Sequence, residues 1–272
     1  MIDTLRLPGN HVPAADCLRD RVVMITGAGQ GLGRAAALAC AAHGAQVVLH
    51  GKRQKKLDAV YDEIVAAGAP EPVIFPLDLA KATDADFQSM AAAIAGQLGR
   101  LDGLVHCAVH LDQLRPLDDE TIDRWLSALR VNLVAAAAIN RACRPLLQAS
   151  PSASVVMTIE THALSPSMFW GSFALSKQAV LSLVAVQAQE WRLMENLRIN
   201  ALLPGPVASP QRNRTHPAED ASALPAPEAI AAGYLYLLDP AGMQASGLLL
   251  DMTPAHAAPL TAAAPASGPA SA

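Results

Sequence analysis

Residues 26–33 read TGAGQGLG and lie between an apolar, β-branched run, RVVMIT at 21–26, and an alanine-rich stretch with helical character at 31–43. Glycines at 27, 31 and 33 let a backbone turn tightly between a strand and a helix and approach a ligand closely. The helix that follows presents unpaired N–H groups and the positive end of its dipole, which suit a phosphate. Glycine would serve a plain strand–helix turn too, but the flanking strand and helix favour a dinucleotide site.

Outward from this turn, short apolar runs alternate with longer helical stretches. The predicted strands are 21–26, 46–50, 72–77, 101–107, 154–159, 197–203 and 247–251. The predicted helices are 31–43, 53–66, 84–98, 120–147, 172–195 and 227–238. Strands that are apolar on both faces are typical of a parallel sheet covered twice by helices. We expect a single-domain α/β fold, a Rossmann-type doubly wound parallel sheet of about seven strands with helices on both faces.

Three segments fall outside this alternation. Residues 1–19 are expected to form an N-terminal leader, and 20–254 to form the dinucleotide-binding domain. The polar, proline-containing segment 208–224 is expected to be a mobile loop. The tail at 255–272 is rich in alanine and proline and is expected to be disordered, because it has little to bury.

Composition excludes several classes of protein. The chain has 272 residues, 52% of them hydrophobic and 16% charged, which excludes disorder as its main state. No stretch approaches the ~20 apolar residues of a membrane span, and a net charge of −4 draws in no nucleic acid. The four cysteines form no C-x-x-C pair, and no His, Asp or Glu cluster has metal-ligand spacing, so we expect free thiols and no metal. The N-terminus has no apolar signal region, which predicts a cytoplasmic protein.

The glycine spacing T-G-x-x-x-G-x-G resembles the fingerprint of the short-chain dehydrogenase/reductase family. Further matches follow in the family's order, namely LDL at 77–79, LDGLV at 101–105, VNL at 131–133, SK at 176–177 and LPGPVAS at 203–209. The resemblance covers about residues 20–254. Locally, WGSFALSKQAV at 170–180 is similar to the YciK-like bacterial oxidoreductases.

This resemblance implies a nicotinamide cofactor. Enzymes that prefer NAD usually carry an acidic residue at the end of the second strand, where this chain has Gly51, Lys52 and Arg53. A basic pair suits the 2′-phosphate of NADP, with NAD as the alternative if the pair is only the solvated start of the next helix. The residues expected to bind the cofactor are Gly27, Gln30, Gly31, Leu32, Gly33, Lys52, Arg53, Asp78, Leu79, Ala108, Lys177, Pro204, Gly205 and Val207.

At the catalytic end, the chain departs from the family. The family transfers a hydride to or from a carbonyl, with a Tyr-x-x-x-Lys pair, a serine that bonds the reacting oxygen, and an asparagine that supports a proton-relay water. Asn132 and Lys177 match, but Phe173 stands at the tyrosine position and Glu160 at the serine position. An alternative register gives the serine position to Thr158 or Thr161.

Three functions remain open from these residues. The first is an NADP-binding protein impaired in ordinary carbonyl reduction, with Glu160 paired to Lys177 as a plug. The second is an active oxidoreductase in which Glu160, with its pKa raised by burial, or His162 acts as acid and base. His162 is otherwise expected to be a histidine on a loop surface. The third is a non-redox lyase or isomerase on the same fold. The small-molecule substrate is not identified.

Two smaller expectations concern neighbouring residues. His106 and Cys107 are adjacent in a strand, so their side chains point to opposite faces and cannot form a catalytic pair, whereas His110 follows that strand and is a candidate to line the pocket. The helices at 120–147 and 172–195 carry more apolar residues than one buried stripe needs. Since the family commonly pairs subunits through these helices, we expect a homo-oligomer, a dimer or a tetramer.

Overall fold

The structure is a computed structural model that describes residues 2–9 and 11–253, so the predicted tail at 255–272 lies outside the described residues. Its centre is one eight-stranded sheet, in which every strand pairs in parallel, in the order β1-β8-β7-β6-β5-β2-β3-β4. The strands are β1 (Asp3–Arg6), β2 (Val22–Thr26), β3 (Gln46–Gly51), β4 (Val73–Pro76), β5 (Gly103–His106), β6 (Ala153–Thr158), β7 (Leu197–Leu203) and β8 (Leu248–Asp251).

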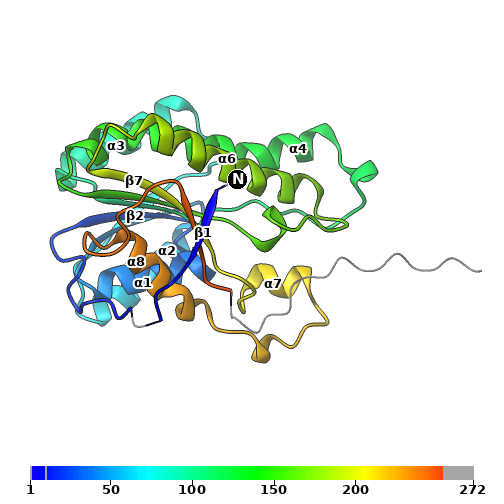
Figure 1. Cartoon of the computed structure of the whole chain (residues 1–272), viewed down its shortest axis with the longest axis horizontal. Coiled ribbons are helices and arrows are strands. Elements are labelled where there is room, and N and C mark those ends of the chain that lie inside the picture. The colour runs from blue at the N-terminus through cyan, green and yellow to red at the C-terminus, as the bar shows by residue number, and fades with distance from the viewer. Residues whose placement is uncertain (1, 10, 254–272) are drawn as a thin grey trace, which may run out of the picture.

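Helices cover both faces of this sheet, as Figure 1 shows, and the predicted doubly wound α/β fold is confirmed. One face carries α1 (Gly31–Ala42), α2 (Gln54–Ala66) and α8 (Ala231–Leu238). The other carries α3 (Asp84–Leu98), α4 (Ile122–Leu129), α5 (Ala135–Ala149) and α6 (Gly171–Glu190). The short helix α7 (Pro210–Thr215) lies beyond the carboxyl ends of the strands.

The core has two halves, one on each face of the sheet. Successive strand side chains point to opposite faces, so Val23 and Ile25 of β2 pack with α1, α2 and α8, while Met24 between them packs with α3, α5 and α6. All three side chains are fully buried. A strand buried on both faces needs apolar residues throughout, which explains the continuous apolar runs of the sequence.

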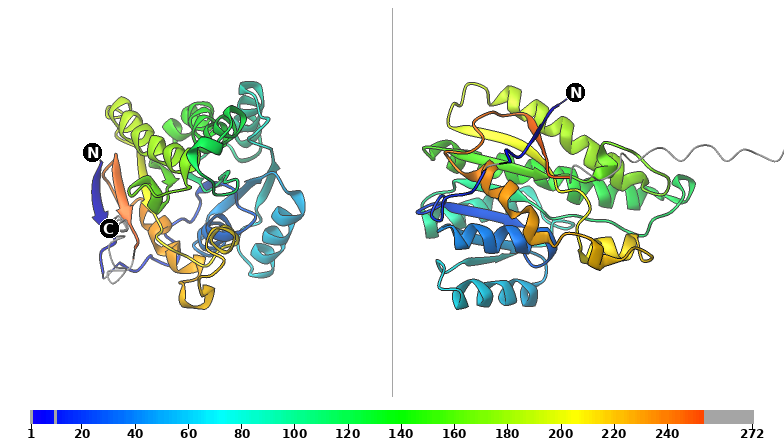
Figure 2. Two further views of the ribbon diagram at one scale, coloured as in Figure 1. Left: turned by 90° about the vertical axis from the view of Figure 1, so that its right-hand side faces the viewer. Right: turned by 60° about the horizontal axis from the view of Figure 1, so that its bottom comes forward.

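The eighth strand is β1, which lies within the segment predicted to be a leader. It pairs with β8 through Asp3↔Leu248 to Arg6↔Asp251, and the Arg6 guanidinium lies 3.0 Å from the Asp251 carboxylate. Figure 2 shows β1 beside β8 at one edge of the sheet. All four β1 residues are exposed, so the strand carries no buried pattern from which it could be predicted.

Two other segments differ from the expectations. The helix predicted at 120–147 begins at Ile122 and is interrupted by one π-helical turn, Arg130–Val134, before α5. The segment 208–224, expected to be a loop, contains α7 and a 3₁₀ turn at Ala221–Ala223. Helix α7 starts at an N-cap, where the Ser209 side chain accepts a hydrogen bond from the Arg212 backbone N–H at 3.1 Å. The segment has no apolar periodicity, so its sequence did not indicate this helix.

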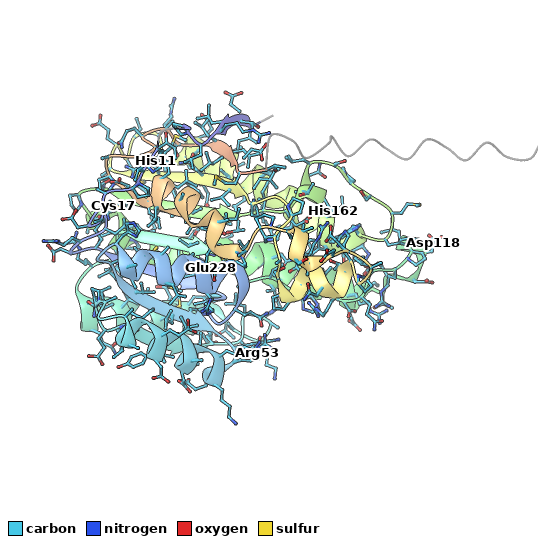
Figure 3. The ribbon with its side chains drawn as sticks, turned by 90° about the horizontal axis from the view of Figure 1, so that it is seen from below. His11, Cys17, Arg53, Asp118, His162 and Glu228 are labelled. Atoms are coloured by element: carbon cyan, nitrogen blue, oxygen red, sulfur yellow. The ribbon has the colours of Figure 1, made fainter. Side chains whose placement is uncertain are left out.

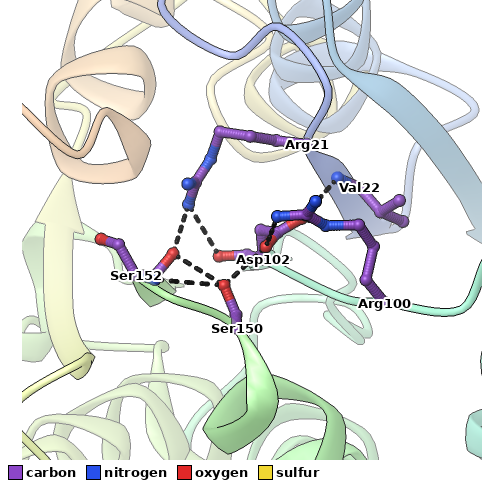
Figure 4. Close-up of polar contacts among 6 residues, drawn as sticks. All are labelled: Arg21, Val22, Arg100, Asp102, Ser150 and Ser152. Atoms are coloured by element: carbon purple, nitrogen blue, oxygen red, sulfur yellow. Dashed lines mark hydrogen bonds and ion pairs between the residues drawn. The ribbon is translucent and has the colours of Figure 1, made fainter.

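A buried polar network at the amino ends of the central strands is drawn in Figure 4. The Asp102 carboxylate, fully buried, accepts hydrogen bonds from the Val22 backbone N–H (2.9 Å), the Arg100 guanidinium (2.8 Å to each oxygen) and the Ser150 hydroxyl (2.5 Å). Burial alone would raise the pKa of Asp102, but these donors and Arg21 outweigh it and hold the pKa below its ordinary value. The network joins β2, β5 and the start of β6.

No helix within the described ranges is both long and apolar enough to cross a membrane.

Candidate active site

A cavity of about 260 Å³ lies at the carboxyl ends of β2, β3, β5 and β6 and extends beneath α7. The chain leaves β2 toward β3 on one side, and β5 is the neighbour of β2 on the other side. The cavity therefore sits where the strand order reverses, and there the helices diverge and leave a crevice. Arg53, at the start of α2, and His162, in the turn after β6, are labelled in Figure 3.

The glycine turn at 26–33 forms one wall of the cavity, and its backbone leaves no room for a side chain at Gly27 or Gly33. A Cβ at Gly27, whose φ is +70°, would lie 2.8 Å from the Ala108 backbone, and one at Gly33 would lie 2.2 Å from the Gly27 carbonyl oxygen. Gly31, with φ at +54°, is different, because a Cβ there would meet no atom closer than 3.9 Å. The backbone at Gly31 is thus open to the cavity at the N-terminus of α1.

A basic wall follows the end of β3. Lys52 and Arg53 are exposed and line the cavity, as does Lys56 one turn further along α2. The Gln30 side-chain oxygen accepts a hydrogen bond from the Arg53 guanidinium at 3.0 Å and a second one from the Lys56 ammonium. Lys56 is not among the predicted cofactor residues, although its i+3 spacing from Arg53 places both on one side of a helix.

His50 is a second cavity residue that the sequence analysis missed. It is fully buried at the end of β3, and neither ring nitrogen has a hydrogen-bond partner among the described residues. Burial, reinforced by the neighbouring His106, lowers the pKa of His50 to about 4. Its ring is therefore neutral at physiological pH.

Lys177 is buried on α6 and borders the inner end of the cavity. Its ammonium donates a hydrogen bond to the Thr158 carbonyl oxygen at 2.9 Å. Burial lowers the pKa of Lys177 to about 8, partly opposed by the nearby Cys107 and Glu160. Phe173 precedes Lys177 by one helical turn, so its buried ring lies on the same side of α6 and also borders the cavity.

Asn132 lies in the π-helical turn, a kind of local irregularity that is frequent at functional sites. Its side-chain amide donates to the Ser176 hydroxyl (2.9 Å) and to the His110 carbonyl oxygen (3.0 Å), and its oxygen accepts from the His110 N–H (2.7 Å). Asn132 therefore anchors the segment after β5 to α6. It borders a small neighbouring cavity rather than the large one, whereas His110 lines the large cavity.

Glu160, Trp170 and Phe173 form what we call the aromatic corner of the cavity. The Glu160 carboxylate accepts hydrogen bonds from the His162 backbone N–H (2.8 Å) and from His162 Nδ1 (2.7 Å), both on Oε2. The His162 ring in turn stacks on Trp170 at 3.6 Å between centroids, and Trp170 lies 5.6 Å from Phe173. His162 is thus buried, and the expectation of a surface histidine is wrong.

Glu160 does not have the raised pKa that the sequence-based hypothesis of a Glu160 acid requires. Burial would raise its pKa, but the bonds from His162 and the charge of Arg212 outweigh burial and leave the pKa below its ordinary value. Glu160 is therefore a carboxylate at neutral pH. Its hydrogen-bond partner among the described residues is His162, whereas the Lys177 ammonium donates to the Thr158 carbonyl.

The two threonines of the alternative register differ in position, and Thr158 borders the cavity. The Thr158 hydroxyl is paired with the Tyr234 hydroxyl at 2.9 Å and with Cys107 Sγ at 3.3 Å, and Thr161 does not border the cavity. Tyr234 packs with α1 and α2, on the face of the sheet opposite α6 and Lys177.

The predicted separation of His106 and Cys107 is confirmed. His106 Nε2 meets the Asn140 side-chain oxygen of α5 at 2.8 Å, whereas Cys107 meets Tyr234 of α8 at 3.4 Å. The two side chains therefore lie on opposite faces of the sheet.

The segment 208–224 contributes residues that its composition did not reveal. Arg212 and Thr215 of α7 line the cavity, and the Arg212 guanidinium makes two hydrogen bonds to the Glu219 carboxylate, at 2.6 and 2.8 Å. This pair ties α7 to the turn that follows it. Its signal in the sequence was only the i+7 spacing of two opposite charges in a polar segment.

All fourteen residues expected to bind the cofactor line the cavity, together with Glu160 and Phe173. The four cysteines are free, as expected, with Cys40 and Cys143 fully buried. Within residues 2–9 and 11–253, no group of three or more His, Cys, Asp or Glu side chains is placed to hold a metal ion.

Comparisons with known proteins agree with this geometry. Residues 21–220 match the family model for short chain dehydrogenases. The chain is 33% identical to the uncharacterized oxidoreductase YciK of Escherichia coli K12 over 90% of this chain and 96% of that protein. Among solved structures, it resembles a short chain dehydrogenase from Pseudomonas syringae (35% identity, TM-score 0.87, 90% of this chain and 99% of that one). It also resembles one from Escherichia coli CFT073 complexed with NADPH (33% identity, TM-score 0.85, 89% and 100%). This chain therefore belongs to the short-chain dehydrogenase family.

Proposed function

We propose that this chain binds NADP(H) in the cavity and is impaired in ordinary carbonyl reduction. The cofactor assignment rests on the glycine wall. A side chain at Gly27 or Gly33 would collide with backbone, while Gly31 stays open at a helix N-terminus. Such a wall fits a pyrophosphate. The similar structure from Escherichia coli CFT073, complexed with NADPH, supports the same assignment.

The other cavity residues fit the remaining parts of the dinucleotide. Lys52, Arg53 and Lys56 would hold a 2′-phosphate by charge, which favours NADP over NAD. Asp78 and Leu79 would border the adenine, and Lys177 the nicotinamide ribose, as in the family. When bound, the cofactor supplies or accepts a hydride.

The impairment rests on Phe173. In the family, a tyrosine at this position gives a proton to the carbonyl oxygen, and a phenylalanine has none to give. General acid catalysis contributes about 10²–10⁴-fold. In addition, the Glu160 carboxylate stands at the serine position, and its charge opposes the negative charge that develops on a carbonyl oxygen as hydride arrives.

The alternative hypothesis, an active oxidoreductase in which Glu160 or His162 serves as the acid, has less support. A general acid is most effective with a pKa near the working pH, and Glu160 is held below its ordinary value. His162 is buried against Trp170 and bonded to Glu160, so its Nδ1 is directed at the carboxylate.

Two measurements test this proposal together. In the first, the protein is titrated into NADPH and the NADPH fluorescence is recorded. In the second, NADPH oxidation is followed with a panel of aldehydes and ketones. Binding without appreciable turnover is the expected result. Absence of binding for both NADPH and NADH would refute the cofactor assignment. Ordinary turnover that Glu160→Gln abolishes would favour an active oxidoreductase with Glu160 as its acid.

We also propose a cytoplasmic homo-oligomer, a dimer or a tetramer. The cytoplasmic assignment is supported by the four free cysteines. The oligomer is supported by exposed apolar side chains along α4, the π-helical turn and α6, namely Ile122 (76% exposed), Leu126 (58%), Val134 (56%) and Val186 (54%). Light scattering coupled to size exclusion would show a mass above that of one chain, and Leu126→Glu should reduce it.

A further inference from the structure

The aromatic corner combines one negative charge with two aromatic rings at the inner end of the cavity. Glu160 Oε2 holds both hydrogen bonds from His162, while Oε1 accepts none from the described residues. Glu160 is one-fifth exposed, Trp170 and Phe173 are nearly buried, and all three border the cavity. A carboxylate oxygen without a hydrogen bond attracts a cation, and the apolar rings beside it keep water away, which strengthens that attraction.

We propose that this site takes a substrate with a cationic carbon–nitrogen double bond, an iminium or a protonated imine, in place of a carbonyl compound. The inference rests on the proposed NADP(H) binding and names the substrate class of that same site. A cationic substrate accounts for both departures from the family, Phe173 in place of tyrosine and Glu160 in place of serine.

The absent tyrosine follows from the proton balance. When a carbonyl is reduced, its oxygen becomes an alkoxide and must be given a proton. When an iminium is reduced, its carbon gains a hydride from NADPH, a C–H bond forms, and the π pair of the C=N bond becomes a lone pair on nitrogen. NADPH leaves as NADP⁺, the products are a neutral amine and the oxidised cofactor, and no proton is consumed. The reaction therefore needs no proton donor at position 173, and Phe173 is compatible with it.

The carboxylate follows from the sign of the charge. Glu160 repels a developing alkoxide, but it attracts a cation, and beside a protonatable imine it favours the protonated form that accepts hydride more readily. This attraction acts on the bound substrate before hydride arrives. Removing it therefore raises KM more than it lowers kcat.

The other charges that face this corner leave Glu160 available. Arg212 lines the cavity but is engaged in its two hydrogen bonds to the Glu219 carboxylate. Lys177 is held by the Thr158 carbonyl, and burial lowers its pKa to about 8. Among the described residues, neither Arg212 nor Lys177 makes a hydrogen bond to Glu160, and His162 bonds only Oε2, so Oε1 remains open to a cation.

Binding of an unreactive cation tests this charge apart from activity. In the full-length protein saturated with NADP⁺, calorimetry measures the affinity for N,N-dimethyl-tetrahydroisoquinolinium, which has no C=N bond, and for tetralone, its neutral counterpart. We expect the cation to bind more tightly than tetralone, and Glu160→Gln to weaken the cation about tenfold or more while leaving tetralone unchanged. Glu190→Gln is the matched control, because Glu190 is exposed at the end of α6 and does not border the cavity.

Turnover provides the second readout. NADPH oxidation with N-methyl-dihydroisoquinolinium should exceed that with tetralone in the wild type, and Glu160→Gln should raise KM for the cation more than it lowers kcat. Equal affinity for the cation in wild type and Glu160→Gln, or turnover of tetralone but not of the iminium, overturns the substrate class. If the protein binds NADPH and these tests fail, only this inference falls. If it binds no NADPH, the proposed function fails, and the inference with it.

Discussion

Restoring the missing acid while removing the opposing charge is the sharpest test of the impaired site. Phe173 is 3% exposed and lies one helical turn before Lys177, so Phe173→Tyr places a phenol beside a buried ammonium. A positioned general acid contributes about 10²–10⁴-fold. The Glu160 carboxylate opposes this gain, because a phenol that gives up its proton becomes a phenolate, which the carboxylate repels. Two unit charges about 4 Å apart at an effective dielectric constant of about 20 repel by about 4 kcal/mol, a factor of about 10³ in rate.

These magnitudes predict strong coupling between the two positions. Phe173→Tyr alone should gain about tenfold at most in carbonyl reduction, because the charge offsets the acid. Glu160→Ser alone removes the charge that opposes the developing alkoxide but supplies no acid, so its gain should stay below that of the double variant. The double variant should exceed Glu160→Ser by about 10²–10⁴-fold, so that its gain over wild type exceeds the product of the two single gains.

The assay is kcat/KM for NADPH oxidation with a fixed aldehyde, measured in wild type, both single variants and the double variant. Phe173→Leu controls for altered packing beside Trp170, and Glu160→Gln in the Phe173→Tyr background removes charge while keeping an acceptor for His162. The double variant should also lose activity at alkaline pH as its phenol ionises. Independent effects of the two changes would refute this reasoning. So would a wild type that reduces carbonyls at ordinary rates and is unharmed by Glu160→Gln.

Three further predictions concern the cofactor and stability. Gly31→Asp projects a carboxylate into the open space at the N-terminus of α1, so it should abolish dinucleotide binding by calorimetry with an unchanged circular dichroism spectrum; retained affinity would place the pyrophosphate elsewhere. Replacing Lys52 and Arg53 together by alanine should weaken NADPH by about 10- to 100-fold and NADH little, whereas equal weakening would mean that the pair does not contact the 2′-phosphate. Asp102→Asn should lower the melting temperature by on the order of 10 °C, because it removes a buried charge that several donors require. Folding lowers the pKa of Asp102, so its contribution should be complete above the unfolded value of 3.8 and decline as pH falls through the folded value; an equal deficit of the variant at pH 7 and pH 2.5 would contradict this assignment.

Much of the fold could be predicted from the sequence because its signals are local. A strand buried on both faces must be apolar throughout, and a backbone that approaches a phosphate must be glycine, so β2, the turn at 26–33 and α1 follow from consecutive residues. The same holds for the position of Phe173 relative to Lys177, since one helical turn fixes it.

The tertiary structure decided what depends on contacts between distant segments. Strand β1 is held by backbone pairing with β8, more than 200 residues away, and its exposed side chains carry no pattern. The ionisation of Glu160 is set by His162 and Arg212 against burial, a balance that residue type alone cannot give. His162 is buried because Trp170 from the next helix stacks on it, and α7 reaches the cavity through a cap and an ion pair. Hydrophobic periodicity reports which side of an element is buried, whereas these features depend on which particular partner lies there.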